Sequence, residues 1–132
     1  MVRRLVWGVV LALAGGCAMA DWVKVTDSME GQVTHYIDPA TLRKVGTLMQ
    51  VVTLTDYRQA QVISDTLRFM SVKMRDEFNC AEQSGRHLSL VALAGTMGTG
   101  PVVATEDRAA PVRAIASGTA DEDMWKHVCG RK

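Results

Sequence analysis

Long apolar runs and an excess of charge of one sign are both missing from this sequence. The longest apolar run covers residues 5–14, which is shorter than the roughly 20 residues of a membrane-spanning helix. The formal net charge of the 132 residues is +1, whereas a nucleic-acid-binding surface needs clustered lysine and arginine. We therefore expect no transmembrane helix and no nucleic-acid partner.

Motifs for catalysis or metal binding are also missing. The sequence has no G-x-S-x-G elbow and no C-x-x-C or H-x-x-x-H spacing. The segment GTMGTG at residues 95–100 lacks the Lys-Ser/Thr that completes a phosphate-binding loop. His35, His87 and His127 lie on two expected strands and at the end of an expected helix, and no spacing brings them together. We expect no enzyme, no metal site and no cofactor.

The N-terminus has the organisation of a secretory signal peptide. Two arginines precede the apolar run, and Ala18-Met19-Ala20 forms a small-x-small cleavage site before Asp21. We expect residues 1–20 to be removed and residues 21–132 to form one domain, a usual length for a single domain. Removal of Arg3 and Arg4 reduces the 15 basic residues to 13, against 14 acidic ones.

A second export signal overlaps the first. Ala14-Gly15-Gly16-Cys17 is a partial lipobox, in which Cys17 would carry a lipid anchor. Its Ala14 stands where leucine is usual, so we favour cleavage before Asp21. The protein is expected to be exported to the periplasm or secreted, or to lie at the outer-membrane surface if Cys17 is lipidated.

Alternation of apolar and polar residues predicts strands along most of the mature chain. The expected strands cover residues 22–26, 31–39, 49–57, 71–80, 86–98 and 101–105. Ser84-Gly85 predicts a hairpin turn, and residues 106–118 are expected to form a loop. Asp76 and Glu77 are adjacent in a strand, so they point to opposite faces and cannot act as paired carboxylates.

The last segment changes to helical periodicity. Thr119 and Glu122 form a capping box, and Gly130 suits a helix C-terminus. The apolar stripe of this helix contains Met124, Trp125, Val128 and Cys129. The apolar side of the strand at 71–80 contains Val72, Met74, Phe78 and Cys80.

Cys129, in the last helical turn, has four alternative roles: nucleophile, metal ligand, packed core residue or half of a disulfide. Export with loss of Cys17 leaves the even pair Cys80 and Cys129 in an oxidising compartment, where disulfides persist. We predict a bridge between these two residues, which would attach the helix to the sheet. The fold class expected is α+β and mainly β: an antiparallel sheet of about five or six strands, with one C-terminal helix packed on it and held by the disulfide.

Six short motifs occur in order between residues 22 and 130: WVKV, YIDPATLRK, VVTLTDY, MRDEFNC, GTMGTGPVV and MWKHVCG. Their combination resembles the bacterial surface-adhesin protein E family. The resemblance implies the same sheet, helix and Cys80 to Cys129 bridge. It also implies a non-enzymatic domain that binds host extracellular-matrix or serum glycoproteins. The alternative is a periplasmic accessory domain that binds a small molecule or an envelope component and has no adhesin role.

Cationic and aromatic side chains are expected together on one face of the sheet. Lys73 and Arg75 lie two residues apart on the polar side of their strand, and Lys24 and Tyr36 occupy the polar sides of the first two strands. Such groups suit acidic polysaccharides or acidic segments of matrix glycoproteins, through charge-assisted contacts and stacking. These four residues are the candidate binding residues.

Overall fold

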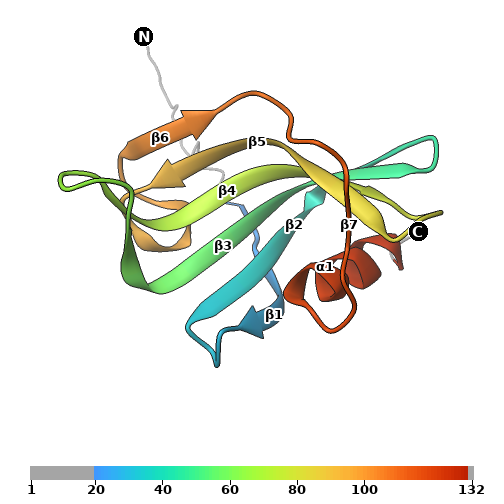
Figure 1. Ribbon diagram of the computed structural model, residues 1–132, viewed down its shortest axis with the longest axis horizontal. Coiled ribbons are helices and arrows are strands. Elements are labelled where there is room, and N and C mark those ends of the chain that lie inside the picture. The colour runs from blue at the N-terminus through green and yellow to red at the C-terminus, as the bar shows by residue number, and fades with distance from the viewer. Residues whose placement is uncertain (1–19, 131–132) are drawn as a thin grey trace, which may run out of the picture.

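The computed structural model describes residues 20–130, which form an antiparallel sheet with an α-helix on one face (Figure 1). The strands are β1 (Val23–Ser28), β2 (Val33–Val45), β3 (Leu48–Val62), β4 (Arg68–Asn79), β5 (Ser84–Leu93), β6 (Val102–Glu106) and β7 (Arg113–Ala114). The helix is α1 (Ala120–Cys129), and a 3-10 helix, η2 (Thr96–Gly98), follows β5. Strands β1 to β6 are neighbours in chain order, and the two-residue β7 pairs with β5. The expected fold class is confirmed.

The expected signal peptide, except for Ala20, lies outside the described residues, and so does Cys17. Within residues 20–130, no helix combines the length and the apolar character needed to cross a membrane.

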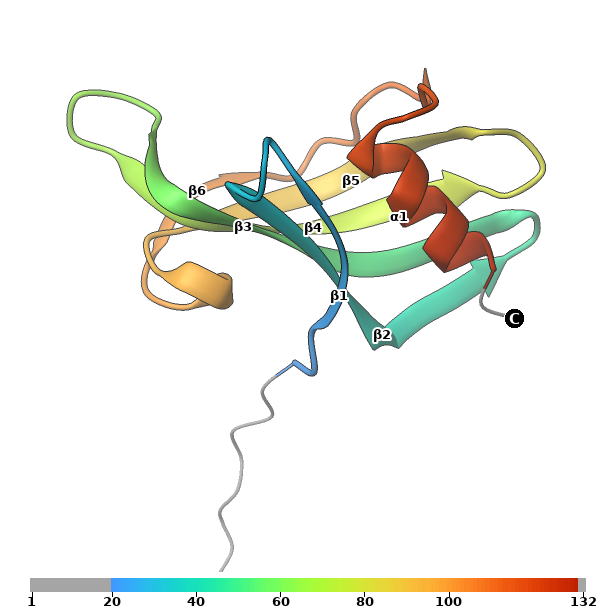
Figure 2. The same cartoon turned by 90° about the horizontal axis from the view of Figure 1, so that it is seen from below.

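The two faces of the sheet carry different elements. Figure 2 shows α1 on one side of the sheet and η2 on the other. We call these the helix face and the open face. The core lies between the sheet and α1 and consists of Ile37, Met49, Val51, Phe78, Ile115, Met124 and Val128. Packing of this apolar stripe against a single sheet face is the main source of stability for such a layered domain.

The capping expected for α1 is present in modified form. The Thr119 hydroxyl accepts a hydrogen bond from the backbone N–H of Glu122 at 3.2 Å. The Glu122 carboxylate reaches back to the backbone N–H of Gly118, at 3.0 Å, instead of to the cap residue itself. The first bond satisfies a donor that the first helical turn leaves without a partner, and the second holds the residue before the cap, so together they fix where α1 begins.

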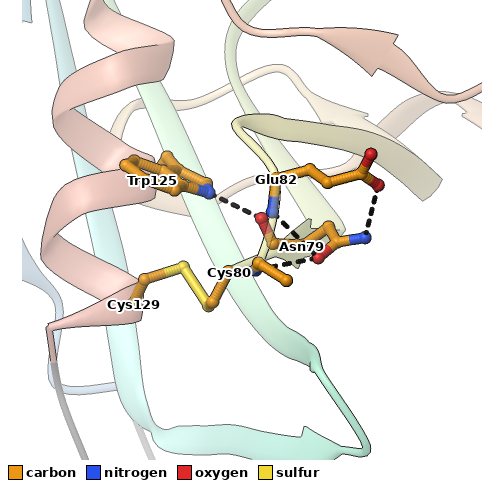
Figure 3. The surroundings of a disulfide bond; sticks show 6 residues. Asn79, Cys80, Glu82, Trp125 and Cys129 are labelled. Carbon is orange, nitrogen blue, oxygen red and sulfur yellow. Dashed lines mark hydrogen bonds between the residues drawn. A yellow bond between two sulfur atoms is a disulfide. The ribbon is translucent and has the colours of Figure 1, made fainter.

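The predicted disulfide attaches the last turn of α1 to the end of β4. Cys80 and Cys129 are bridged with their Cα atoms 5.5 Å apart, within the usual range for a disulfide. One turn earlier on the same side of α1, Trp125 donates from its indole nitrogen to the backbone oxygen of Asn79 at 2.8 Å (Figure 3). The helix is therefore held at this end by a covalent bond and a hydrogen bond as well as by packing.

The prediction of a hairpin turn at Ser84-Gly85 is wrong. The turn covers residues 80–83, and Ser84 already begins β5. The side chain of Asn79 ends β4, because its oxygen accepts from the backbone N–H groups two and three residues further on. Gly85 serves close approach of strands instead, since a Cβ there would lie 2.8 Å from the backbone oxygen of Glu77.

Candidate functional site

A pocket of about 290 Å³ lies on the helix face, beyond the N-terminal end of α1. We call it the helix-side pocket. Strands β2 to β5 form its floor, the β1–β2 turn and the first turns of α1 form its sides, and Arg113 of β7 lies at its rim. The sheet continues past the helix at this end, as Figure 2 shows, so the floor is not covered by α1.

The floor of the helix-side pocket is polar although it is buried. Thr53, Thr55 and Asp76 are 1%, 7% and 6% exposed. The Thr53 hydroxyl donates to one oxygen of Asp76 at 2.8 Å, and the other oxygen is bonded to Nδ1 of His87. A buried carboxylate with both oxygens hydrogen-bonded is held in one orientation.

The two histidines of the pocket have opposite electrostatic environments. Burial lowers the pKa of His35, whose ring nitrogens lie 2.9 Å from the Ser28 hydroxyl and 3.5 Å from the Thr55 hydroxyl. The hydrogen bond to Asp76 raises the pKa of His87. No motif spacing in the sequence predicts this pair, but β2 and β5 direct both rings into one pocket.

His127, the third histidine, lies in the last turn of α1 and is not among the residues that line this pocket. Across residues 20–130, no group of three or more histidine, cysteine, aspartate or glutamate side chains is arranged to hold a metal ion.

The rim of the pocket is formed by an ion pair. Arg113 donates to the carboxylate of Asp121 at 2.6 Å, and both side chains are about half exposed. Asp121 lies in the first turn of α1, where the helix dipole favours an acidic residue. Arg113 falls in the segment 106–118, which the sequence pattern predicts to be a loop, and it is not among the candidate binding residues.

His87 should make the stability of the domain depend on pH. Its folded pKa lies above the ordinary value of 6.5, so its contribution is full below pH 6.5 and is lost as the pH rises through the folded pKa. The other groups that act on it are Arg113, which lowers its pKa, and Asp121, which raises it. In urea unfolding, His87→Gln should destabilise the protein most near pH 6 and progressively less toward about pH 9.

His35→Gln is the matched control for this pH series. The folded pKa of His35 is lowered, so its contribution is present above pH 6.5 and is lost as the pH falls through the folded pKa. The two variants should therefore differ from the wild type with opposite pH trends. Parallel pH profiles for the wild type and His87→Gln would contradict the assignment of a raised pKa to the His87–Asp76 pair.

The four sequence-predicted binding residues all lie on the open face, opposite α1. Lys24 pairs with Tyr36, Tyr36 with Leu54, and Leu54 with Lys73, which makes one row across four strands. Arg75 lies two residues after Lys73 on β4 and shares its face. The register therefore brings the four side chains to one side of the sheet.

The open face is partly covered, although the alternation of polar and apolar residues along its strands predicts an exposed surface. The η2 segment folds over it: Gly98 and Met97 donate backbone hydrogen bonds to Ser71 and Asp56, at 2.9 and 2.7 Å. Below this segment, a Cβ on Gly98 would lie 2.8 Å from Cε of Lys73. Lys73 is consequently half-buried.

Other charges on this face are partly compensated. Arg75 is exposed, whereas Lys24 forms an ion pair with Asp27 at 2.9 Å. Glu77, two residues after Arg75 on β4, is buried and bonded to Arg86 at 3.0 Å. Among the three predicted cations, Lys24 is therefore exposed but paired, Lys73 is half-buried and Arg75 is exposed.

Comparison with known proteins agrees with this architecture. The sequence model of one family, described as surface-adhesin protein E, matches residues 22–130. No curated protein sequence matches the chain. Among solved structures, the selenomethionine form of Haemophilus influenzae protein E is 12% identical with a TM-score of 0.65, over 90% of this chain and 94% of that chain.

Two further structures give the same result. Crystal form II of Haemophilus influenzae protein E is 11% identical with a TM-score of 0.66, and 92% of this chain and 97% of that chain are covered. Protein E from non-typeable Haemophilus influenzae is 12% identical with a TM-score of 0.63, over 91% and 83% of the two chains. At such low identity the structural likeness shows a shared fold.

Proposed function

This chain belongs to the surface-adhesin protein E family, and from that premise we propose that it is an exported, non-enzymatic domain that binds acidic polysaccharide or acidic segments of host matrix and serum glycoproteins. A surface adhesin acts by binding and not by catalysis. The family match supports the adhesin-like character, and the arrangement of the open face supports the chemistry of the ligand.

The observation that carries this proposal is the row of side chains on the open face. Lys24, Tyr36 and Lys73 lie in one row, with Arg75 beside it. Cationic groups form charge-assisted hydrogen bonds with sulfate or carboxylate groups, and an aromatic ring stacks on a sugar or a cation. Strands β1, β2 and β4 of one hydrogen-bonded sheet carry these groups, so their backbone is already ordered, which reduces the entropy lost on binding.

Reversing the charge of Lys73 and Arg75 together should abolish retention of the protein on heparin. Lys73→Glu with Arg75→Glu replaces two attractive contacts by two repulsive ones, and wild-type retention should fall steeply with salt. Retention on an immobilised heparin column across a salt gradient measures this, with the melting temperature as the test of folding.

The matched control is Arg58→Glu with Arg108→Glu, which changes the net charge equally at two exposed positions. This control should retain most of the heparin binding. Equal losses in both double variants would show that net charge alone drives retention. Unchanged retention of a folded Lys73→Glu, Arg75→Glu variant would remove the open face from consideration.

Export and the start of the mature chain form a separate prediction. We expect the mature protein to begin at Asp21, with residues 21–132 as the functional domain and residues 1–20 removed. Intact mass of the protein from fractionated cells measures this directly. A diacylglyceryl group on Cys17 would contradict it and would place the domain at the outer-membrane surface. Recovery in the periplasm alone would favour the alternative role as an accessory domain that binds a small molecule or an envelope component.

A further inference from the structure

The helix face changes from apolar to polar within one sheet. Under α1, its side chains are those of the core, such as Ile37 and Phe78. Beyond the end of α1, the same strands place Thr53, Thr55 and Asp76 at buried positions. Burial of polar groups costs free energy that apolar residues would not cost, so this arrangement adds little to folding. Such a cost is typical of sites that bind a ligand.

The polar groups of the pocket are held in fixed positions before any ligand enters. Asp76 is bonded through one oxygen to Thr53 and through the other to His87. His35 lies between the hydroxyls of Ser28 and Thr55. The residues that make these bonds come from five strands, β1 to β5. A site that is already ordered loses little entropy on binding.

The charges that line the pocket are already balanced. Each charged side chain of the lining has an oppositely charged neighbour. In the pocket the pairs are Asp76 with His87 and Arg113 with Asp121, whereas Arg86 is paired with Glu77, which belongs to the open face. An ionic ligand would have to separate one of these pairs. A neutral ligand with hydroxyl groups would add hydrogen bonds to both partners of a pair, because a hydroxyl both donates and accepts.

The apolar lining and the size of the pocket restrict the class of ligand further. Tyr57, Met74, Phe78 and Met124 add apolar and aromatic groups to its lining. A sugar ring combines apolar C–H faces with hydroxyl groups at its edge, which matches a lining of apolar and polar groups. The volume of about 290 Å³ is at the lower end for ligand pockets, so it suits one small ring and not a long chain.

We propose that the helix-side pocket binds a small, neutral, polyhydroxylated molecule of the size of a single sugar ring. In this arrangement the hydroxyl groups of the ligand contact Thr55, Asp76 and His87 at the floor and Arg113 and Asp121 at the rim. The site is separate from the open face, and it does not depend on the proposed binding of acidic glycans there.

Amide NMR of the ¹⁵N-labelled mature chain tests this proposal. The probes are glucose, galactose, mannose and N-acetylglucosamine, each at roughly 10 mM, where a ligand with a Kd of about 1 mM is mostly bound. At least one of them should shift the amide signals of Thr53, Asp76 and His87 in a saturable way. N-acetylneuraminic acid, a charged sugar, should not do so at the same concentration.

Variants on the two faces provide the matched comparison. Arg113→Gln at the rim and Thr55→Val at the floor should each weaken the binding about fivefold, the effect of one lost hydrogen bond. Arg75→Gln on the open face should leave it unchanged. Each spectrum also reports whether the variant is folded.

Three results would overturn the proposal. They are no saturable shift with any neutral sugar, shifts confined to the open face, and pocket shifts with N-acetylneuraminic acid alone. The amide shifts of the wild-type chain test the proposed pocket even if a variant fails to fold. Loss of heparin retention in the Lys73→Glu, Arg75→Glu variant with unchanged sugar shifts would show that the two sites are independent.

Discussion

Replacing Cys80 and Cys129 together by alanine should lower the free energy of unfolding by about 4 kcal/mol. The bridge joins residues separated by 49 positions, and in the chain-entropy model a loop of that length removes much conformational freedom from the unfolded chain. The free energy of unfolding of a small domain is about 5–15 kcal/mol in total, so the variant should be marginally stable at best. Urea unfolding of the oxidised wild type and of the double variant measures the difference.

Reduction supplies the control for the disulfide. A reducing agent should destabilise the wild type by a similar amount and should leave the double alanine variant unchanged. Intact mass after alkylation of the unfolded, unreduced wild type should show no modified cysteine. Alkylation of both residues without reduction, or equal urea midpoints for the two proteins, would contradict the role assigned to the bridge.

Ile37→Ala should cost about 2–5 kcal/mol of folding free energy. Ile37 is 0% exposed and belongs to the core cluster between the sheet and α1. Truncation to alanine loses the transfer free energy of the removed carbons and leaves a cavity, because sheet and helix cannot close fully around it. Equilibrium unfolding in urea gives the value.

The same substitution at Ile63 is the matched control. Ile63 lies just past the end of β3, in the β3–β4 hairpin, and is 47% exposed, so Ile63→Ala should change the stability by less than about 0.5 kcal/mol. The pair removes the same atoms from a buried and an exposed site. Similar losses at both positions would show that the packing between α1 and the sheet contributes less than the burial of Ile37 indicates.

Much of the fold is predictable from the sequence because it depends on local patterns. Alternation along residues 71–80 assigns Val72, Met74 and Phe78 to one face, and the structure has them on the helix face. Thr119 and Glu122 mark the start of α1 through bonds within one turn. The alternation and the capping box both depend only on residues that are close together in the sequence.

The disulfide is also predictable, because an exported chain that keeps two cysteines on apolar faces has one bridge to form. The hairpin turn is where local reasoning failed. Ser84-Gly85 has turn composition, yet the side chain of Asn79 ends β4 earlier, and Gly85 is required for close packing of the strands. A glycine can mark either a turn or a close approach of two strands. The sequence does not distinguish these roles, because the position of the neighbouring strand decides between them.

The sequence by itself determined the sheet, the helix, the bridge and the face that carries Lys24, Tyr36, Lys73 and Arg75. Tertiary structure alone decided the helix-side pocket and the cover over the open face. The hydrogen bond between Thr53 and Asp76 joins residues 23 positions apart, and the bond from Met97 to Asp56 joins residues 41 positions apart. Such contacts follow from strand register and from the path of loops, which short-range periodicity does not encode.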